Sequence, residues 1–298
     1  MNRSDTFSSF HPAVNFLYFA LVLVFSMCLM HPVCLAISLF SALFYSSYLN
    51  GAKAMLKNLV WLVPVMLFAA ILNPVFNHEG ATILGYFLNG NPLTLESIVY
   101  GLAAAVMLAA VISWFGCYSS VMCSDKFLYL FGRVIPALSL VLSMTLRFIP
   151  KFKVQLSSVQ QAQRMIGRDP AKASFPKKVR YGVTNFSILL TWSLENAIET
   201  ADSMKSRGYG LPGRSKFSIY RFDSRDGRCL AWLLFCAFYL ISGWLAGGFD
   251  CRYFPKFHLA ALDPFTVSFL LVYLLLCLTP LIIDRKEDLT WTRLQSKI

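Results

Sequence analysis

Six long apolar runs constrain what this chain can fold into more than any other feature. They cover residues 13–30, 33–49, 59–76, 98–121, 229–249 and 265–283. Each run is long enough to cross the hydrocarbon core of a bilayer as a helix, at about 1.5 Å per residue. Because 57% of all residues are hydrophobic and only 14% are charged, the chain is predicted to be an all-α, polytopic membrane protein with about six transmembrane helices.

The basic residues predict how the chain is oriented. If the amino terminus is cytoplasmic and the spans alternate in direction, all of the 27 Lys and Arg except Arg252 and Lys256 fall in cytoplasmic segments. An excess of Lys and Arg is typical of cytoplasmic loops, so both termini are expected in the cytoplasm and the net charge of +12 needs no nucleic-acid partner. The first run leads directly into the second and lacks a small-residue cleavage site, which predicts a transmembrane helix and not a signal peptide.

A basic segment, residues 125–228, separates the fourth and fifth runs and is expected to form a cytoplasmic domain. Its apolar stretch 127–149 is interrupted by Pro136 and Arg147, and a seventh span there would send the basic residues that follow to the outside. Apolar spacing and stop signals predict two long helices, residues 136–166 before Gly167 and residues 176–207 before Gly208. The expected domains are therefore residues 1–124 in the membrane, 125–228 on the cytoplasmic side, and 229–298 with two further spans and a cytoplasmic tail.

Small side chains predict where the two long helices cross. Ser193, Ala197 and Ala201 are spaced four apart and share one helix face. Small residues at this spacing allow two helix backbones to approach closely, so we expect the crossing at this ridge. The alternative is that they are ordinary surface residues.

Several kinds of chemistry have no signature in this sequence. It contains no phosphate-binding loop, no His-Glu-x-x-His and no Gly-x-Ser-x-Gly. Its eight cysteines have no metal-type spacing, so no metal or other cofactor is expected in this chain. The central parts of the spans hold no Asp or Glu, which disfavours an ion-driven carrier. A self-contained permease and a membrane-embedded enzyme remain the alternatives to a non-catalytic membrane subunit.

A set of short fragments, in order along most of the chain, resembles one family of transport proteins. The fragments are Asn73-Pro74-Val75-Phe76, Pro92-Leu93-Thr94, Tyr100-Gly101, Leu146-Arg147-Phe148-Ile149-Pro150, Ala162-Gln163-Arg164 and Ser206-Arg207-Gly208-Tyr209-Gly210. Together they resemble the transmembrane T component of energy-coupling factor (ECF) transporters, which import vitamins and trace metal ions. The family usually has one span after its coupling helices, whereas this chain has two apolar runs there.

The resemblance implies a scaffold without catalytic activity. Its two coupling helices would dock into grooves of two cytoplasmic ABC ATPase subunits, which bind ATP and Mg²⁺, while a separate membrane S component binds the substrate. The implied second docking motif is Ser206-Arg207-Gly208. The first is altered to Met165-Ile166-Gly167 with Arg164 before it, so an asymmetric ATPase pair is expected. The implied location is the plasma membrane of a bacterium or archaeon.

Overall fold

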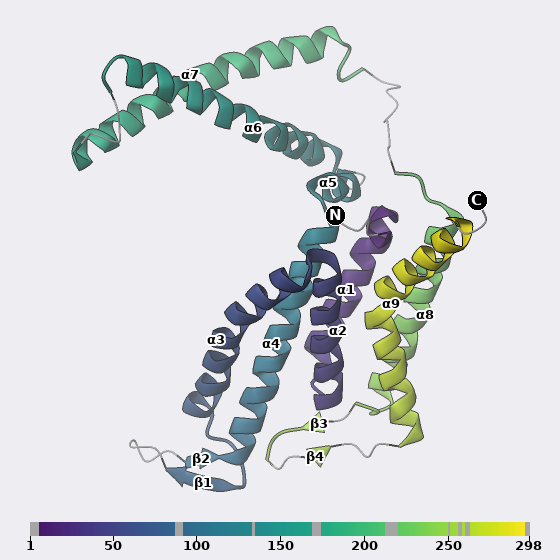
Figure 1. Cartoon of the computed structure of the whole chain (residues 1–298). Coiled ribbons are helices and arrows are strands. Elements are labelled where there is room, and N and C mark those ends of the chain that lie inside the picture. Colours follow the sequence, from purple (N-terminus) through teal and green to yellow (C-terminus); the bar gives the residue numbers. More distant parts are fainter. Residues whose placement is uncertain are drawn as a thin grey trace. The chain divides into compact units, whose positions relative to one another are not determined.

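The computed structural model describes residues 6–86, 92–132, 135–168, 174–211, 220–249, 251–255, 258–259 and 263–295. Lys256, one of the two basic residues expected outside, is not among them. The described chain is almost entirely helical (Figure 1), so the predicted all-α class is confirmed. Its helices are α1 (Pro12–Cys28), α2 (Pro32–Asn50), α3 (Ala52–Phe76), α4 (Leu95–Val121), α5 (Ser124–Gly132), α6 (Pro136–Met165), α7 (Phe175–Ser206), α8 (Ser224–Leu245) and α9 (Pro264–Gln295).

Two short antiparallel hairpins, which the sequence analysis did not predict, join pairs of helices. Strands β1 (Ile83–Tyr86) and β2 (Pro92–Thr94) lie between α3 and α4, and strands β3 (Cys251–Arg252) and β4 (His258–Leu259) lie between α8 and α9. A 3-10 helix, η1 (Phe7–Ser9), precedes α1.

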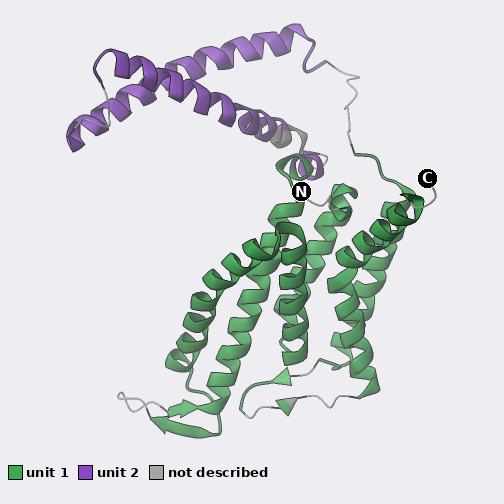
Figure 2. Ribbon diagram, viewed as in Figure 1, with its two compact units in different colours: residues 1–127, 220–298 green, residues 128–219 purple. Residues whose placement is uncertain are grey.

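The chain divides into two compact units (Figure 2). Residues 1–127 and 220–298 form the first, which we call the membrane unit, and residues 128–219 form the second, which we call the crossed-helix unit. The expected first and third domains thus belong to one unit. The stretch from Tyr220 to Arg228, expected with the cytoplasmic domain, belongs to the membrane unit because α8 already begins at Ser224.

Every predicted apolar run forms a helix of the membrane unit. Five helices, α2, α3, α4, α8 and α9, are long and apolar enough to cross a bilayer, and α1 is an apolar helix of 17 residues. Among the described residues, α5 is too short to cross a bilayer, and α6 and α7 contain no stretch that is both long and apolar enough. The protein is therefore a multi-pass membrane protein, as predicted.

Aromatic and small polar side chains hold α9 inside the membrane unit. Trp114 Nε1 of α4 donates to Ser38 Oγ of α2 at 3.1 Å, and Ser38 Oγ lies 2.7 Å from Ser26 Oγ of α1. Ser26 Oγ is in turn 3.1 Å from the hydroxyl of Tyr273 on α9. All four side chains are buried, and such interhelical hydrogen bonds in a bilayer contribute about 0.6–2 kcal/mol each. The last apolar helix is thus an integral part of the bundle.

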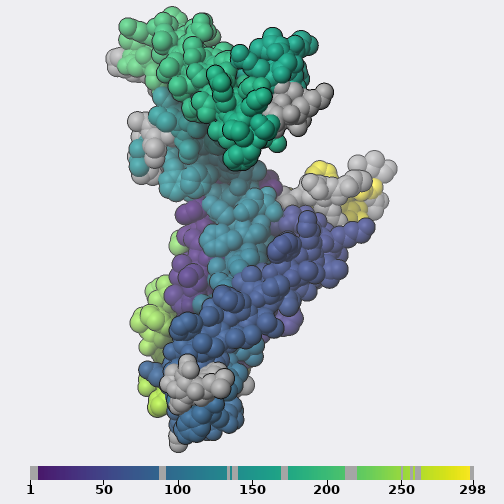
Figure 3. Space-filling model, turned by 90° about the vertical axis from the view of Figure 1, so that its left-hand side faces the viewer, coloured from purple at the N-terminus to yellow at the C-terminus, as the bar shows by residue number. Residues whose placement is uncertain are grey.

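By contrast, α3 is mostly uncovered. Of its residues only Leu62 and Pro74 are buried, and large side chains such as Trp61, Phe68 and Phe76 are exposed. Figure 3 shows α3, in indigo to blue, running along one face of the membrane unit. A long apolar helix with so little cover is suited to contact with lipid or with another membrane protein.

Candidate docking site

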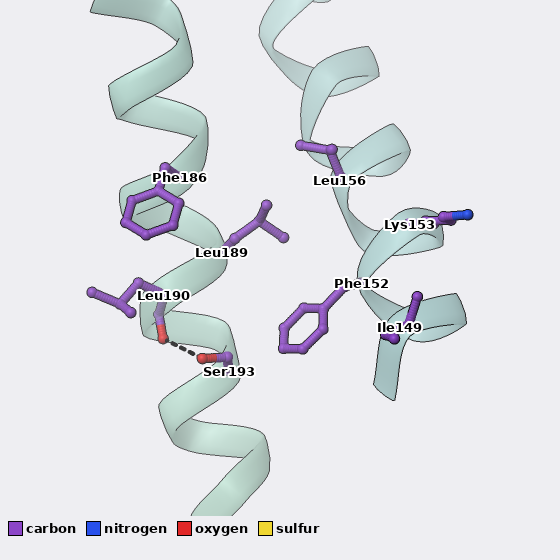
Figure 4. A pocket seen from close by; sticks show the side chains of 8 residues that line it. All are labelled: Ile149, Phe152, Lys153, Leu156, Phe186, Leu189, Leu190 and Ser193. Carbon is purple, nitrogen blue, oxygen red and sulfur yellow. Dashed lines mark hydrogen bonds between the residues drawn. The ribbon is translucent and has the colours of Figure 1, made fainter. Parts of the chain in front are cut away.

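The two long helices of the crossed-helix unit, α6 and α7, cross each other near their middles (Figure 1). The Phe152 and Trp192 rings meet edge to face, with centroids 5.7 Å apart. Val159 of α6 and Asn185 of α7 are also buried. Beside it lies an open apolar groove of about 440 Å³ (Figure 4), lined by Ile149, Phe152, Lys153, Leu156, Phe186, Leu189, Leu190 and Ser193.

The predicted small-residue ridge is only partly at this crossing. Ser193 lines the groove, and its hydroxyl donates to Leu190 O at 3.0 Å within the same helix. Ala197 and Ala201 are exposed. The crossing is built from large side chains because the ring of Phe152 stands between the two backbones, where a ridge of small residues would bring them into direct contact.

The carboxyl end of α6 is closed by a Schellman motif. The amide of Gly167 donates to Arg164 O at 3.0 Å, and the amide of Arg168 donates to Gln163 O at 2.9 Å. Gly167 has a φ of +80°, the left-handed conformation that glycine adopts without a steric penalty. Ile166 is the residue just before this glycine, at the C-cap position.

The carboxyl end of α7 is closed by the same motif. The amide of Gly208 donates to Lys205 O at 3.0 Å, the amide of Tyr209 donates to Met204 O at 3.0 Å, and Gly208 has a φ of +75°. Arg207 is the C-cap residue here. The two helix ends therefore correspond residue by residue, and Ile166 stands where the other helix has Arg207.

Both helix ends present their side chains to solvent. Met165 is 90% exposed and Ile166 is 64% exposed, which is unusual for large apolar side chains at a helix end. Ser206 and Arg207 are exposed too. Within the crossed-helix unit the two ends lie on opposite sides of the crossing (Figure 1). The unit thus displays two separate tips with the same backbone, one apolar and one cationic.

The charges around the α7 tip favour a cation there. The helix dipole places partial negative charge at this end, and Glu195, Glu199 and Asp202 on the preceding turns are exposed. None of these three carboxylates forms an ion pair within the described residues. Across all the residues that the structure describes, no group of three or more His, Cys, Asp and Glu is placed to hold a metal ion.

The fold and these tips define an all-α, multi-pass membrane protein with a pair of crossed helices. Residues 8–219 match the family described as cobalt transport protein, CbiQ. The match covers well over half of the chain, so the chain belongs to this family. It includes α1 to α7, with both helix tips, and it ends before α8.

Curated relatives carry the name of energy-coupling factor transporter transmembrane protein EcfT. The chain is 31% identical to that of Lactococcus lactis subsp. cremoris over 105 residues, 35% of this chain and 40% of the relative. It is 25% identical to that of Streptococcus thermophilus over 188 residues, 60% of this chain and 69% of the relative. It is 24% identical to that of Bacillus subtilis over 191 residues, 61% and 71% of the two chains. The matched stretch of the Lactococcus relative spans less than half of its length.

Proposed function

We propose that this chain is the transmembrane coupling subunit of an ATP-driven ECF-type importer for a vitamin or a trace metal ion. The α6 and α7 tips dock into two cytoplasmic ABC ATPase subunits, which bind ATP and Mg²⁺. When those subunits close on ATP, the two tips move relative to each other. The crossed helices pass this motion to a separate membrane S component that binds the substrate. The family membership and the names of the relatives support this class.

The observation that carries the proposal is the equivalence of the two tips. The two tips share one backbone motif, but one presents an exposed Ile166 and the other an exposed Arg207. They therefore suit two grooves of the same shape and different chemistry. Arg207 suits a groove that holds a carboxylate, since guanidinium and carboxylate groups form bidentate hydrogen bonds. Ile166 suits an apolar groove. The expected partner is therefore an asymmetric ATPase pair.

The S component would rest on apolar surface that the chain leaves uncovered. The α6–α7 groove and the exposed side of α3 are the two such surfaces described above. In this arrangement the protein lies in a bacterial or archaeal plasma membrane with both termini in the cytoplasm. The first residues of α1 and the last of α9 lie at the same end of the membrane unit (Figure 1), which is compatible with this topology.

The proposal is tested by purifying the tagged chain from its native membrane and quantifying the ATPase subunits that accompany it. Arg207→Glu reverses the charge at the α7 tip, and Ile166→Glu puts a charge on the α6 tip. Since an unpaired buried charge at an interface costs about 2–5 kcal/mol, each variant should lower ATPase recovery more than tenfold. Membrane insertion should be unchanged, because both side chains are exposed.

Matched controls near the start of α7, far along the chain from both tips, separate docking from general effects of charge. Arg180→Glu makes the same charge reversal in the first turns of α7, and Val183→Glu adds a carboxylate at a side chain that is 63% exposed. Neither should change ATPase recovery. If Arg207→Glu and Ile166→Glu bring down as much ATPase as the two controls, the assignment of the tips is wrong.

A further inference from the structure

A second groove, separate from the docking tips, lies between α8 and α9 in the membrane unit. Its volume is about 820 Å³, and Phe10 contributes to it from the segment before α1. Both helices lie beyond the residues 8–219 that match the family. The two helices that form the groove therefore lie outside the stretch that the family match covers, and the proposed ATPase docking makes no use of them.

The groove changes from apolar to cationic along its length. Trp232, Leu275 and Ile282 line its apolar part. Arg225, Arg228 and Lys286 line the other end, where α8 begins and α9 leaves its apolar stretch. Since α8 and α9 run in opposite directions, their charged ends meet at one level of the membrane unit (Figure 1).

The cationic end of the groove carries more positive charge than its carboxylates neutralise. Arg225 is neutralised by Glu287, with Nη1 3.4 Å from Oε1, and its guanidinium lies 5.8 Å from the centre of the Phe10 ring. Arg228 and Lys286 are exposed, and neither forms an ion pair in the part of the chain that the structure describes. Two positive charges therefore face whatever occupies this end of the groove.

We propose that the groove binds an anionic phospholipid from the leaflet that surrounds the charged ends of α8 and α9. The headgroup phosphate lies at Arg228 and Lys286, and an acyl chain lies along the apolar wall. The dimensions fit, since the eleven helical steps from Leu275 to Lys286 rise about 16 Å, close to half of a hydrocarbon core of about 30 Å. A zwitterionic lipid fits less well, because its headgroup would bring a further cation next to Arg228 and Lys286. A free phosphate also fits less well, because it would leave the apolar wall of the groove uncovered.

Trp232 makes the proposal measurable. The full chain is delipidated in detergent, and its tryptophan fluorescence is followed while phosphatidylglycerol with brominated acyl chains is added. Brominated phosphatidylcholine and inorganic phosphate, the latter added as a competitor, test the other two sources of the phosphate group. We expect saturable quenching by phosphatidylglycerol at lower lipid fractions than by phosphatidylcholine, and no competition by phosphate. In Trp232→Phe the difference between the two lipids should disappear.

Charge variants test the cationic end. Because a Lys or Arg near an anionic lipid contributes about a fivefold change in affinity, Arg228→Gln and Lys286→Gln should each weaken phosphatidylglycerol binding about fivefold, and both together about 25-fold. Lys53→Gln with Lys57→Gln is the matched control, since it removes two exposed cations at the start of α3, outside the groove. Unchanged elution and helical circular dichroism establish that each variant is folded.

Three results would overturn the proposal. The first is equal quenching by the two lipids, which would make the groove ordinary lipid-facing surface. The second is lipid selectivity that persists in Trp232→Phe or in the double variant of Arg228 and Lys286, which would place the lipid elsewhere. The third is displacement of phosphatidylglycerol by inorganic phosphate, which would assign the cations to a free anion. None of these results bears on ATPase docking.

Discussion

Gly101 of α4 lies directly against Asn73 of α3. A Cβ atom on Gly101 would stand 3.1 Å from the Cβ of Asn73 and 2.8 Å from the carbonyl oxygen of Ala70. The side-chain Nδ2 of Asn73 also donates to Ser97 O at 2.8 Å. Two of the sequence fragments that carry the family resemblance, one ending α3 and one near the start of α4, therefore meet in a single contact between the helices.

This contact predicts that Gly101→Ala destabilises the membrane unit. The added methyl group has no room, so α3 and α4 must separate, at a cost of about 1–3 kcal/mol. The expected result is a lower thermal unfolding midpoint of the purified chain in detergent. Gly116→Ala is the matched control in the same helix, because nothing lies within 4 Å of a Cβ there. Equal midpoints for the two variants would contradict the close approach of α3 and α4.

The left-handed backbone at Gly208 predicts that the α7 tip tolerates asparagine better than alanine at this position. Alanine in a left-handed conformation costs about 1–2 kcal/mol, whereas asparagine adopts it more readily. Gly208→Ala should therefore open the α7 end and speed exchange of the Tyr209 amide proton about fivefold or more. Gly208→Asn should have a smaller effect.

Gly167 provides the comparison at the other tip. A Cβ at Gly208 would approach Leu211 Cδ1 to 3.1 Å, while nothing lies within 4 Å of one at Gly167. Gly167→Ala should thus show the effect of backbone strain alone. The exchange rate of the Arg168 amide proton should rise less in this variant than that of Tyr209 does in Gly208→Ala. Exchange that is the same for alanine and asparagine at both tips would argue against the Schellman geometry.

Much of the fold follows from patterns that act along the chain. The apolar runs locate all six helices, although α3 begins well before its run, at Ala52, and α9 continues well past its run, to Gln295. Glycines after helical periodicity place the ends of α6 and α7 within one residue, at Met165 and Ser206. These signals are local, since they depend on spacing within one helix and on the backbone preference of one residue.

Features that depend on distant parts of the chain could not be predicted in this way. The α8–α9 groove requires the register of two antiparallel helices, which brings Arg228 to the level of Lys286. The hydrogen bonds from Trp114 to Ser38 and on to Tyr273 join α4, α2, α1 and α9. The spacing of Ser193, Ala197 and Ala201 identified a shared face, but not which large side chains would reach the crossing first.

The position of the crossing gives a third prediction. Phe152→Ala removes the edge-to-face contact with Trp192, which contributes about 0.5–1.5 kcal/mol beyond its buried area. Spin labels on exposed positions of α6 and α7 should then report a broader distribution of distances. Ala197→Leu, on an exposed position, should leave the distribution unchanged. If the distance distribution broadened in Ala197→Leu and not in Phe152→Ala, the helices would cross at the small-residue ridge and not at Phe152.

His31 predicts how stability depends on pH. Its side chain is fully buried at the turn between α1 and α2, and neither ring nitrogen has a hydrogen-bond partner in the described chain. Burial lowers the pKa of His31, so the unfolded chain binds this proton more readily than the folded chain. Stability should therefore fall as the pH drops through the ordinary histidine pKa of about 6.5.

His31→Leu should flatten this dependence when thermal unfolding midpoints are compared between about pH 8 and pH 5. His258→Leu, at an exposed position of β4, should retain it. A pH dependence of full size in His31→Leu would show that another group is responsible.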